Sequence, residues 1–367
     1  MPEPTPGPRW VLIAAGGTGG HLFPAQALAE ALKRRGWRIA LATDERVEGL
    51  TAAFPAERRV ALSAGTFRRG DPLGAVRAAM AIGRGVLQAG GFLRQVRPAV
   101  VVGFGGYPSL PALIAAIVSG RPTVIHEANA VLGRANRFLA PHVGAVACAF
   151  PTLLKASAKV RARAVVVGNP VRPEIAALAG QGYAPPENEI RLLITGGSQG
   201  ARLLSELTPE AVAKLPQALR LKLKVEQQTR PESLESARET YAKARVEAEV
   251  APFFRNMASR LAAAHLVVGR AGASTVSEIA VAGRPAVLVP LKVALDDDQA
   301  RNAEVLRAAG AAEVALEDQL TAPALTAILR KLLSSPRRLS RMAAAAAHLA
   351  RPDAAERLAD LVTRVAD

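Results

Sequence analysis

The chain has 367 residues, of which 50% are hydrophobic, 4% are aromatic and one, Cys148, is a cysteine. This length is enough for two domains that each bury a core, and the composition is typical of an α/β protein. A lone cysteine excludes an internal disulfide and favours a reducing cytoplasm. The start, MPEPTPGPRW, has prolines where a signal peptide has its apolar region, so a short loose tail is expected there.

The net charge of +16 is unevenly distributed along the chain. Residues 1–170 carry 21 Lys and Arg against 8 Asp and Glu, a net charge of +13, whereas residues 171–367 carry 26 against 23, a net charge of +3. The positive field therefore belongs to the first half, and it suits an anionic bilayer surface, a phosphorylated substrate or a nucleic acid. Because the sequence has neither an aromatic-studded basic ribbon nor a zinc-finger spacing, no nucleic-acid partner is expected.

Residues 10–26, WVLIAAGGTGGHLFPAQ, organise the first half. The apolar run at 10–15 predicts a strand buried on both faces, and glycines at 16, 17, 19 and 20 follow it directly. Helical spacing begins at His21, with Pro24 tolerated in the first turn. A strand, a glycine turn and a helix N-terminus together form a place where free N–H groups and the helix dipole meet an anion.

Two other interpretations of this stretch stay open. The glycines could serve only to let the strand and the helix pack closely. A dinucleotide fingerprint is weakened, because Leu22 stands where G-x-G-x-x-G requires its third glycine. It is not excluded, since Asp44 ends the next expected strand and could bind a ribose.

Strand-like runs recur through the first half with helical stretches between them, which is the alternation of a parallel sheet covered by helices. Glycines and prolines interrupt the uncharged segment 98–120, so it predicts a strand, a turn and a buried helix rather than a membrane span. The expected strands are residues 10–15, 38–43, 99–103, 123–127 and 144–148.

Residues 67–97 form a basic amphipathic stretch. Apolar residues at 73, 76, 80 and 87 fall at helical spacing, and Arg77 and Arg84 are seven apart on what we expect to be a different face. Further arginines at 68, 69, 94 and 97 flank them. Such a helix can lie on an anionic membrane, and the alternative is a core-facing helix with solvated arginines. Four glycines between 83 and 91 argue against a long rigid helix.

The second half repeats this architecture. A strand at 190–195 runs into GGSQGAR, and a strand at 265–269 runs into RAGASTVSEIAVAG before another strand at 286–290. Two nucleotide-fold halves are expected, each with glycine loops at its strand ends, and two such halves face to face make a cleft. We expect domains at 1–168 and 169–345, with a final helix at about 346–367 packing back on the first domain.

Six motifs occur in order: GGTGGH at 16–21, GFGGYPS at 103–109, HEAN at 126–129, VGNPVR at 167–172, GGSQGAR at 196–202 and AGASTVSEIAVAGRPAVLVP at 271–290. Together they resemble the MurG family of bacterial peptidoglycan N-acetylglucosaminyltransferases, from near the N-terminus to about residue 310. The resemblance implies a GT-B fold, two Rossmann-like domains facing across a cleft, and an inverting transfer on the cytoplasmic face of the membrane. The donor would be UDP-N-acetylglucosamine (UDP-GlcNAc), the acceptor undecaprenyl-diphosphate-linked lipid I, and the product lipid II.

Two positions depart from the family pattern. Ala128 stands where the family commonly has Gln, and Asp298 stands where the family usually has His before the retained Gln299. The polar contacts at these two positions are therefore left open.

An inverting transfer needs a base for the acceptor hydroxyl and dipolar or positive groups for the departing diphosphate. A helix beginning near Ser274 would offer free N–H groups to that diphosphate, although Ser274 and Thr275 could also be simple N-cap residues. By resemblance, Glu278 would accept from the ribose hydroxyls, Phe254 would lie near the uracil, and Gln299 and Asn129 would read the sugar hydroxyls. The implied donor-binding set is Thr18, Gly19, Gly20, Asn129, Arg172, Ser198, Phe254, Ala273, Ser274, Thr275, Val276, Ser277, Glu278 and Gln299. The implied acceptor diphosphate set is Gly16, Gly17, Gly105, Gly106, Tyr107 and Ser109.

His21 is the first candidate for the catalytic base. A helix N-terminus lowers the pKa of an imidazole and keeps it neutral, whereas an acceptor diphosphate nearby would raise that pKa. Capping the helix or binding phosphate is an equal alternative for His21. Glu127 is the second candidate, and for this residue a buried carboxylate paired with an arginine is at least as good an interpretation.

No tightly bound cofactor and no protein metal site are predicted. Residues 296–298, DDD, could hold Mg²⁺ as a D-x-D motif does, but that motif goes with a single nucleotide domain, so a solvated acidic loop is preferred. Mg²⁺ could accompany the substrate diphosphate loosely. Besides lipid I transfer, two functions stay open: transfer from a UDP-sugar to another lipid or glycolipid acceptor, and nucleotide-sugar or NAD binding without catalysis.

Overall fold

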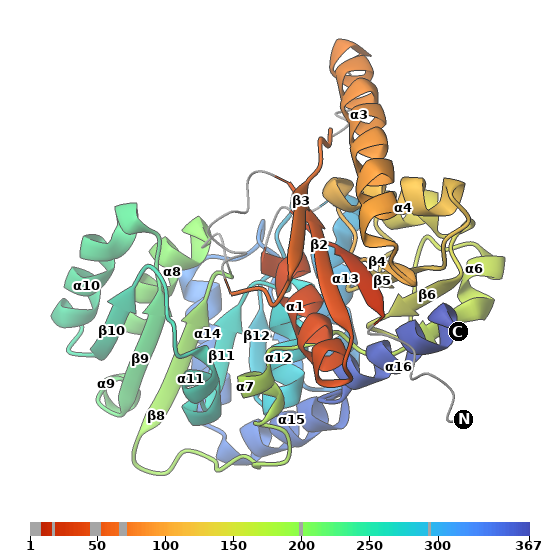
Figure 1. Ribbon diagram of the computed structural model, residues 1–367. Helices are drawn as coiled ribbons and strands as arrows, with labels where there is room; N and C mark the ends of the chain where they lie inside the picture. Colours follow the sequence, from red (N-terminus) through yellow and green to blue (C-terminus); the bar gives the residue numbers. More distant parts are fainter. Residues whose placement is uncertain (1–8, 17–18, 45–52, 66–71, 198–200, 293–294) are drawn as a thin grey trace. The chain divides into compact units, whose positions relative to one another are not determined.

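The computed structural model describes residues 9–16, 19–44, 53–65, 72–197, 201–292 and 295–367. The chain forms two compact units, the first made of Met1–Arg172 with Asp353–Asp367 and the second of Pro173–Pro352. Each unit is a parallel sheet with helices packed on it (Figure 1). The chain returns to the first unit at Asp353 rather than near 346, because the helix before that point contacts α12 and α14 of the second unit.

The first unit contains a seven-stranded parallel sheet in the order β3-β2-β1-β4-β5-β6-β7. The strand order reverses between β1 and β4, which is the topological switch point of a Rossmann-type sheet. Its strands are β1 (Trp10–Ala14), β2 (Arg38–Thr43), β3 (Arg58–Ala61), β4 (Val100–Gly103), β5 (Thr123–Glu127), β6 (Ala145–Cys148) and β7 (Ala164–Val166). Its helices are α1 (Gly19–Arg34), α3 (Pro72–Val96), η2 (Tyr107–Ser109), α4 (Leu110–Val118), α5 (Arg134–Leu139), α6 (Ala158–Arg163) and α16 (Ala354–Ala366).

β1 is buried on both faces, as its apolar run predicts. Val11 and Ile13 belong to a core that includes residues of α1 and α16, whereas Leu12 and Ala14 belong to a second core with residues of α3 and α4. Alternate side chains of a strand point to opposite faces, so the two cores lie on the two faces of this sheet. The helix after β1 begins at Gly19 rather than at His21, which places Pro24 in its second turn.

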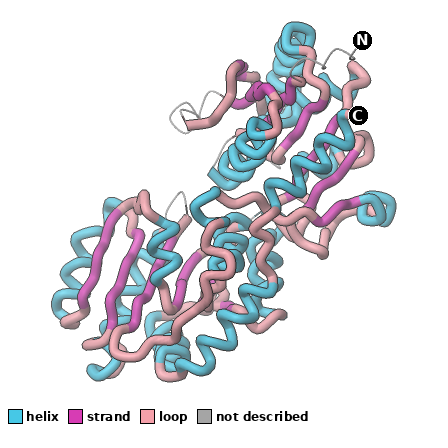
Figure 2. Tube along the Cα trace, turned by 60° about the horizontal axis from the view of Figure 1, so that its bottom comes forward, coloured by secondary structure: helices cyan, strands magenta, loops and turns pink. Residues whose placement is uncertain are grey.

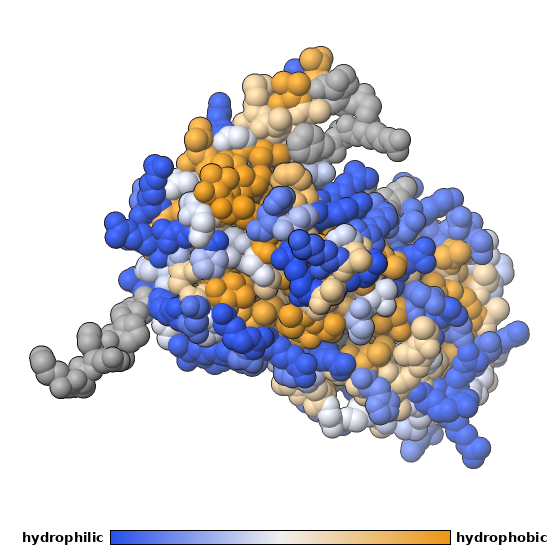
Figure 3. Space-filling model, turned by 90° about the vertical axis from the view of Figure 1, so that its right-hand side faces the viewer, coloured by the Kyte–Doolittle hydropathy of each residue, from blue (hydrophilic) through white to orange (hydrophobic). Residues whose placement is uncertain are grey.

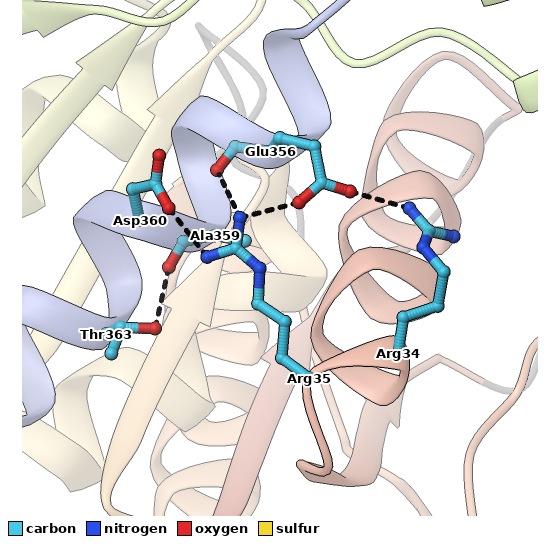
Figure 4. A network of polar contacts seen from close by, with 6 residues as sticks. All are labelled: Arg34, Arg35, Glu356, Ala359, Asp360 and Thr363. Carbon is cyan, nitrogen blue, oxygen red and sulfur yellow. Dashed lines mark hydrogen bonds and ion pairs between the residues drawn. The ribbon is translucent and has the colours of Figure 1, made fainter.

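The C-terminal helix α16 packs against α1 (Figure 4). Arg35 pairs with Glu356 at 2.5 Å and with Asp360 at 2.7 Å, and Arg34 also pairs with Glu356 at 2.7 Å. Partly exposed ion pairs of this kind contribute little to stability. The docking therefore depends mainly on the apolar face of α16, of which Leu358 and Val362 are fully buried in the core with α1.

α3 is one continuous helix of 25 residues, so the predicted interruption by its glycines is wrong. A Cβ built at Gly85 would lie 2.1 Å from the Ser63 carbonyl oxygen and 3.0 Å from Pro111 of α4. Glycine is required there because it lets the helix approach its neighbours closely. Tertiary packing thus offsets the low helix propensity of glycine.

The outer face of α3 is apolar and exposed over much of its length. Leu73 is 71% exposed, Val76 57%, Met80 64% and Leu87 79%. The expected separation of faces is wrong, because the exposed Arg77 and Arg84 each follow an exposed apolar residue by four positions and share its side of the helix. The core-facing residues are Ala78, Ala89, Leu93 and Val96, so the four large apolar residues do not face the core.

The uncharged segment 98–120 forms β4, the turn η2 and the largely buried α4, as predicted. Among the described residues, no helix combines the length and the apolar character needed to cross a membrane.

The second unit contains a six-stranded parallel sheet in the order β10-β9-β8-β11-β12-β13, which reverses between β8 and β11. The strands of each sheet run side by side and helices lie against them (Figure 2). The strands are β8 (Ile190–Thr195), β9 (Leu223–Gln228), β10 (Glu247–Ala251), β11 (Leu266–Gly269), β12 (Ala286–Leu288) and β13 (Ala312–Val314). The helices are α7 (Pro173–Ala176), α8 (Arg202–Ala213), α9 (Gln217–Arg220), η3 (Pro231–Ser233), α10 (Leu234–Lys243), α11 (Met257–Ala263), α12 (Ala273–Ala282), η4 (Leu295–Asp297), α13 (Asp298–Ala308), α14 (Ala322–Leu333) and α15 (Pro336–His348).

Candidate functional site

The two glycine turns of the first unit meet at its switch point, after β1 and after β4. A Cβ built at Gly16 would lie 2.5 Å from the Cβ of Pro108, so the turn after β1 contacts the turn after β4 directly. Gly105 and Gly106 have positive φ angles of 81° and 73°, which favour glycine. Open α/β sheets bind ligands at this edge, so the glycines at 16, 105 and 106 lie where the sequence predicts a ligand.

His21 lies in the first turn of α1 with its ring against the turn after β4. A Cβ at Gly106 would lie 3.5 Å from His21 Nε2, and one at Gly105 would lie 3.6 Å from its Cε1. The side chain is half-buried, and its Nδ1 is buried without a hydrogen-bond partner among the described residues. Burial lowers the pKa of His21, although the Glu127 charge and the Phe104 carbonyl act in the opposite direction. A neutral imidazole can accept a proton, which is the property that a base requires.

Glu127 ends β5 as a buried carboxylate held by four amide N–H groups. Its Oε1 accepts from the backbone N–H of Asn129 at 3.0 Å and from the Asn129 side chain at 3.1 Å. Its Oε2 accepts from the Gly133 N–H and from Asn136 Nδ2, both at 2.9 Å. The sequence left open an arginine as the partner of this buried carboxylate, but the donors of these four bonds are amides. Glu127 therefore fixes the loop that leads to α5.

Asn136 is a residue of this site that the sequence analysis missed. Its Nδ2 donates to Glu127 and, at 3.1 Å, to the His126 carbonyl, and it lies 3.2 Å from a Cβ built at Gly105. His126 is fully buried, and its Nε2 donates to the Gly168 carbonyl at 2.9 Å. Burial, with a smaller contribution from His21, lowers the pKa of His126 to about 4, although the Gly168 hydrogen bond opposes the shift. Asn136 links the glycine turn to Glu127.

The remaining predicted residues of the first unit differ in exposure. Gly19 and Gly20 begin α1, and Tyr107 is half-buried. Ser109 is fully buried and donates its hydroxyl to the Gly106 carbonyl at 2.8 Å, so it supports the turn. The Arg172 guanidinium lies 5.5 Å from the centre of the Phe23 ring, a cation–π contact. Gly17 and Thr18 lie outside the described residues.

The second unit presents the N-terminus of α12 at its own switch point. Gly272 is the N-cap in an extended conformation and no side chain caps the helix, so the N-cap interpretation of Ser274 and Thr275 is wrong. The first intrahelical hydrogen bond runs from the Val276 N–H to the Gly272 carbonyl. The N–H groups of residues 273–275 therefore have no intrahelical acceptor and point beyond the helix end. Ser274 Oγ is buried there without a partner among the described residues, and Ser277 and Glu278 are half-buried.

Gln228 is a second residue that the sequence analysis missed. It ends β9, accepts from the Thr195 hydroxyl at 3.1 Å, and donates to the Gly197 carbonyl at 3.1 Å and the Pro252 carbonyl at 3.3 Å. One side chain thus ties the glycine turn after β8 to the loop after β10. The sequence signals this role only through the residue type, an amide side chain at the end of a strand. Ser198 lies outside the described residues.

Phe254, predicted to lie near the uracil, is only 4% exposed, and its ring lies 3.9 Å from the Arg260 guanidinium. Arg260 is held in turn by Glu226 and Glu249, at 2.7 Å each. Its neighbour Phe253 is 60% exposed. Any contact of Phe254 with a ligand would therefore involve its backbone more than its ring.

The acidic loop before Gln299 has an unusual backbone. Asp296 and Asp297 have left-handed φ angles of 66° and 58°, and Asp298 accepts from the Gln299 N–H at 2.9 Å. Non-glycine residues in this conformation are uncommon and gather at functional sites. Within the described residues, no three His, Cys, Asp or Glu side chains are grouped to hold a metal ion.

Both halves of the chain match one glycosyltransferase family. Residues 11–148 match the glycosyltransferase family 28 N-terminal domain, and residues 191–358 match the family 28 C-terminal domain. A relative from Phenylobacterium zucineum (strain HLK1), a UDP-N-acetylglucosamine--N-acetylmuramyl-(pentapeptide) pyrophosphoryl-undecaprenol N-acetylglucosamine transferase, is 65% identical over 98% of this chain and 99% of its own length. The transferase of the same name from Caulobacter vibrioides (strain NA1000 / CB15N) is 61% identical over 98% of this chain and 99% of its own.

Solved structures show the same similarity. The crystal structure of Acinetobacter baumannii MurG matches with a TM-score of 0.79 and 31% identity, over 97% of this chain and all of that one. A kitacinnamycin glycosyltransferase matches with a TM-score of 0.70 at 19% identity, over 98% of this chain and all of that one, which indicates a shared fold alone.

Proposed function

Because the chain belongs to the MurG family within glycosyltransferase family 28, we propose that it transfers N-acetylglucosamine from UDP-GlcNAc to the C4 hydroxyl of the N-acetylmuramyl group of lipid I. The product is lipid II, the precursor for peptidoglycan. The observation that carries this proposal is the similarity to transferases of this name over nearly the whole chain. The α/β class and the GT-B fold with two Rossmann-like domains, both predicted from the sequence, are confirmed.

The donor is assigned to the second unit. The uncapped N–H groups at the start of α12 suit the diphosphate, because a helix N-terminus stabilises negative charge. Glu278, one turn further along α12, accepts from the ribose hydroxyls, and Gln299 reads the sugar. The same N–H groups stabilise the charge that develops on the departing UDP.

The acceptor is assigned to the first unit. Its lipid-linked diphosphate binds the backbone N–H groups of the turns that contain Gly16, Gly105 and Gly106, at the carboxyl ends of β1 and β4. His21, held neutral by burial, takes the proton of the C4 hydroxyl as that oxygen attacks the anomeric carbon and UDP leaves. Glu127 has its oxygens occupied by amides, which favours a supporting role over that of the base.

Labelled UDP-GlcNAc and a lipid I analogue test the assigned reaction. We expect label to enter the lipid fraction, and a control acceptor without the N-acetylmuramyl group to stay unlabelled. Transfer to a glycolipid but not to lipid I would favour the other acceptor class. No transfer to any lipid, with or without Mg²⁺, would overturn the proposal, and calorimetry with UDP and NAD would then identify the nucleotide that binds.

Attachment to the cytoplasmic surface of the membrane is the second part of the proposal. The exposed apolar residues of α3 lie beside Arg77 and Arg84, the combination by which a helix lies on an anionic bilayer. In Figure 3, hydrophobic and hydrophilic residues lie next to each other on the surface around α3. Replacing Leu73, Met80 and Leu87 with Ser should abolish sedimentation with anionic vesicles. Leu221, 65% exposed in the second unit, is the matched control, and unchanged sedimentation of the triple variant would overturn this assignment.

No tightly bound cofactor is part of the proposal. Mg²⁺ acts only as a loose counterion of the substrate diphosphate, since phosphates bind Mg²⁺ while it keeps several waters. Activity should therefore survive dialysis against a chelator once free Mg²⁺ is restored or replaced by another hard cation. Permanent loss of activity after that treatment would indicate a resident metal instead.

A further inference from the structure

A buried ion pair joins the carboxyl ends of three neighbouring strands in the second unit. Arg270 directly follows β11 and Glu317 follows β13, and the two side chains pair at 2.7 Å although they are only 10% and 22% exposed. β12 lies between these two strands, and Arg270 also donates to the Val289 carbonyl just after β12, at 3.2 Å. The pair therefore spans the edge of the sheet at which the ligand is expected.

The second oxygen of Glu317 holds the loop that follows β12. Its Oε2 accepts from the backbone N–H of Lys292 at 2.7 Å. Burial alone would raise the pKa of the Glu317 carboxyl, but the Lys292 N–H and the Arg270 charge outweigh burial and lower that pKa. The carboxylate is thus charged at neutral pH, and each of its oxygens has a separate donor.

The held loop is the one that orients Gln299. The Leu291 N–H, next to the anchored Lys292, donates to Gln299 Oε1 at 3.0 Å. Asn302, three residues further along α13 and on the same side of the helix, donates to the Ala271 carbonyl at 3.2 Å, in the turn before α12. Gln299 therefore faces the same turn, and since its oxygen accepts from Leu291, its NH₂ group is the part that can donate to a ligand.

We propose that Glu317 is a positioning residue for the donor sugar: through Arg270 and the Lys292 N–H it holds the loop that aims the Gln299 NH₂ group at a sugar oxygen. This inference rests on the proposed function, which assigns the donor to this unit. The ribose and the diphosphate are assigned to α12, whereas the hydrogen bonds and ion pair of Glu317 among the described residues run to Arg270 and the Lys292 N–H. Glu317 should accordingly act on binding of the sugar-bearing nucleotide and not on binding of UDP.

The Glu317→Gln variant tests the positioning role, because it keeps the shape of the side chain and removes its charge. Its amide nitrogen must face either Arg270 or the Lys292 N–H, so one donor loses its acceptor. We expect the Kd of UDP-GlcNAc, measured by calorimetry, to rise about tenfold, the size expected for losing one charged hydrogen bond, while the Kd of UDP stays unchanged. The control is Glu304→Gln, which removes an exposed carboxylate paired with Arg307 on α13 and should change neither Kd.

The Gln299→Ala variant and the double variant separate positioning from general damage. If Glu317 acts through Gln299, the double variant should bind UDP-GlcNAc no more weakly than Gln299→Ala alone. Equal affinity of wild-type protein and Glu317→Gln for UDP-GlcNAc would overturn the inference, and so would a parallel loss of UDP binding. The readout is binding, so a protein that binds UDP-GlcNAc but transfers nothing to lipid I would contradict the proposed function and leave this inference standing.

Discussion

The two switch points share a strand order but are built from different polar groups. In the first unit, amides, two imidazoles and the buried Glu127 carboxylate surround the turns after β1 and β4. In the second unit, Gln228 and the Arg270–Glu317 pair fix the loops, and the start of α12 is left uncapped. One scaffold therefore supports two chemistries: neutral imidazoles suit proton transfer, and free N–H groups suit binding of a diphosphate.

The sharpest test of this division replaces His21. We expect His21→Ala to lower kcat by about 10²- to 10⁴-fold, the usual contribution of a general base. Binding of UDP, which we assign to the second unit, should not change. The exposed His142 provides the control His142→Ala, which should keep full activity. A variant at His21 with normal kcat, or with weakened UDP binding, would break the comparison.

Glu127 should matter to stability more than any other carboxylate of the first unit that we have described. Glu127→Gln keeps the shape but turns an amide NH₂ group toward amide donors, leaving a buried N–H group without its acceptor. We expect the free energy of unfolding in urea to fall by about 2–3 kcal/mol. Glu57→Gln, at an exposed pair with Arg38, should cost less than about 1 kcal/mol. Equal losses would show that the amide cage is not stabilising.

In the second unit, Glu278 should affect nucleotide binding and little else. The variant Glu278→Ala removes the oxygens that we propose accept from the ribose hydroxyls, so it should raise the Kd of UDP about tenfold. Glu278 is half-buried near the start of α12, whereas Glu235 on α10 is exposed and gives the control Glu235→Ala. An unchanged Kd for UDP in Glu278→Ala would show that the ribose does not bind Glu278. That result would not bear on the assignment of the diphosphate to the helix N-terminus.

The architecture could be predicted from the sequence because it follows from local patterns. Apolar runs at 10–15 and 190–195 predicted the first strand of each sheet correctly. The predicted interruption of α3 failed, because a helix that contains Gly83, Gly85 and Gly90 is stabilised by contacts with segments distant in sequence. Such contacts leave no periodicity in the helix itself.

The supporting residues of the sites were harder to predict than the glycine motifs. Asn136, Gln228 and Glu317 each join loops that are far apart in sequence, and none belongs to a motif with fixed spacing. A single Asn, Gln or Glu in an ordinary helix, strand or loop looks like a solvated residue. Its role becomes visible only when the strand order brings the loops to one edge of a sheet.

The smallest expected effect concerns the pH dependence of stability in the first unit. His126 has an ordinary pKa of 6.5 when unfolded and a pKa of about 4 in its buried position, so the folded state binds its proton less readily. The stabilisation is therefore complete above pH 6.5 and is lost as the pH falls toward 4. Between pH 6.5 and 5.5 the loss from this group should be about 1 kcal/mol.

The variant His126→Gln isolates this contribution, because a Gln amide can still donate to the Gly168 carbonyl. The free energy of unfolding is measured in urea at pH 6.5 and at pH 5.5. The loss of stability between these two pH values should be about 1 kcal/mol smaller in the variant than in the wild type. The exposed His348 of the second unit supplies the control His348→Gln, which should keep the wild-type pH dependence. If His126→Gln also kept it, the acid sensitivity would belong to other groups, and the buried imidazole of the first unit would not be its source.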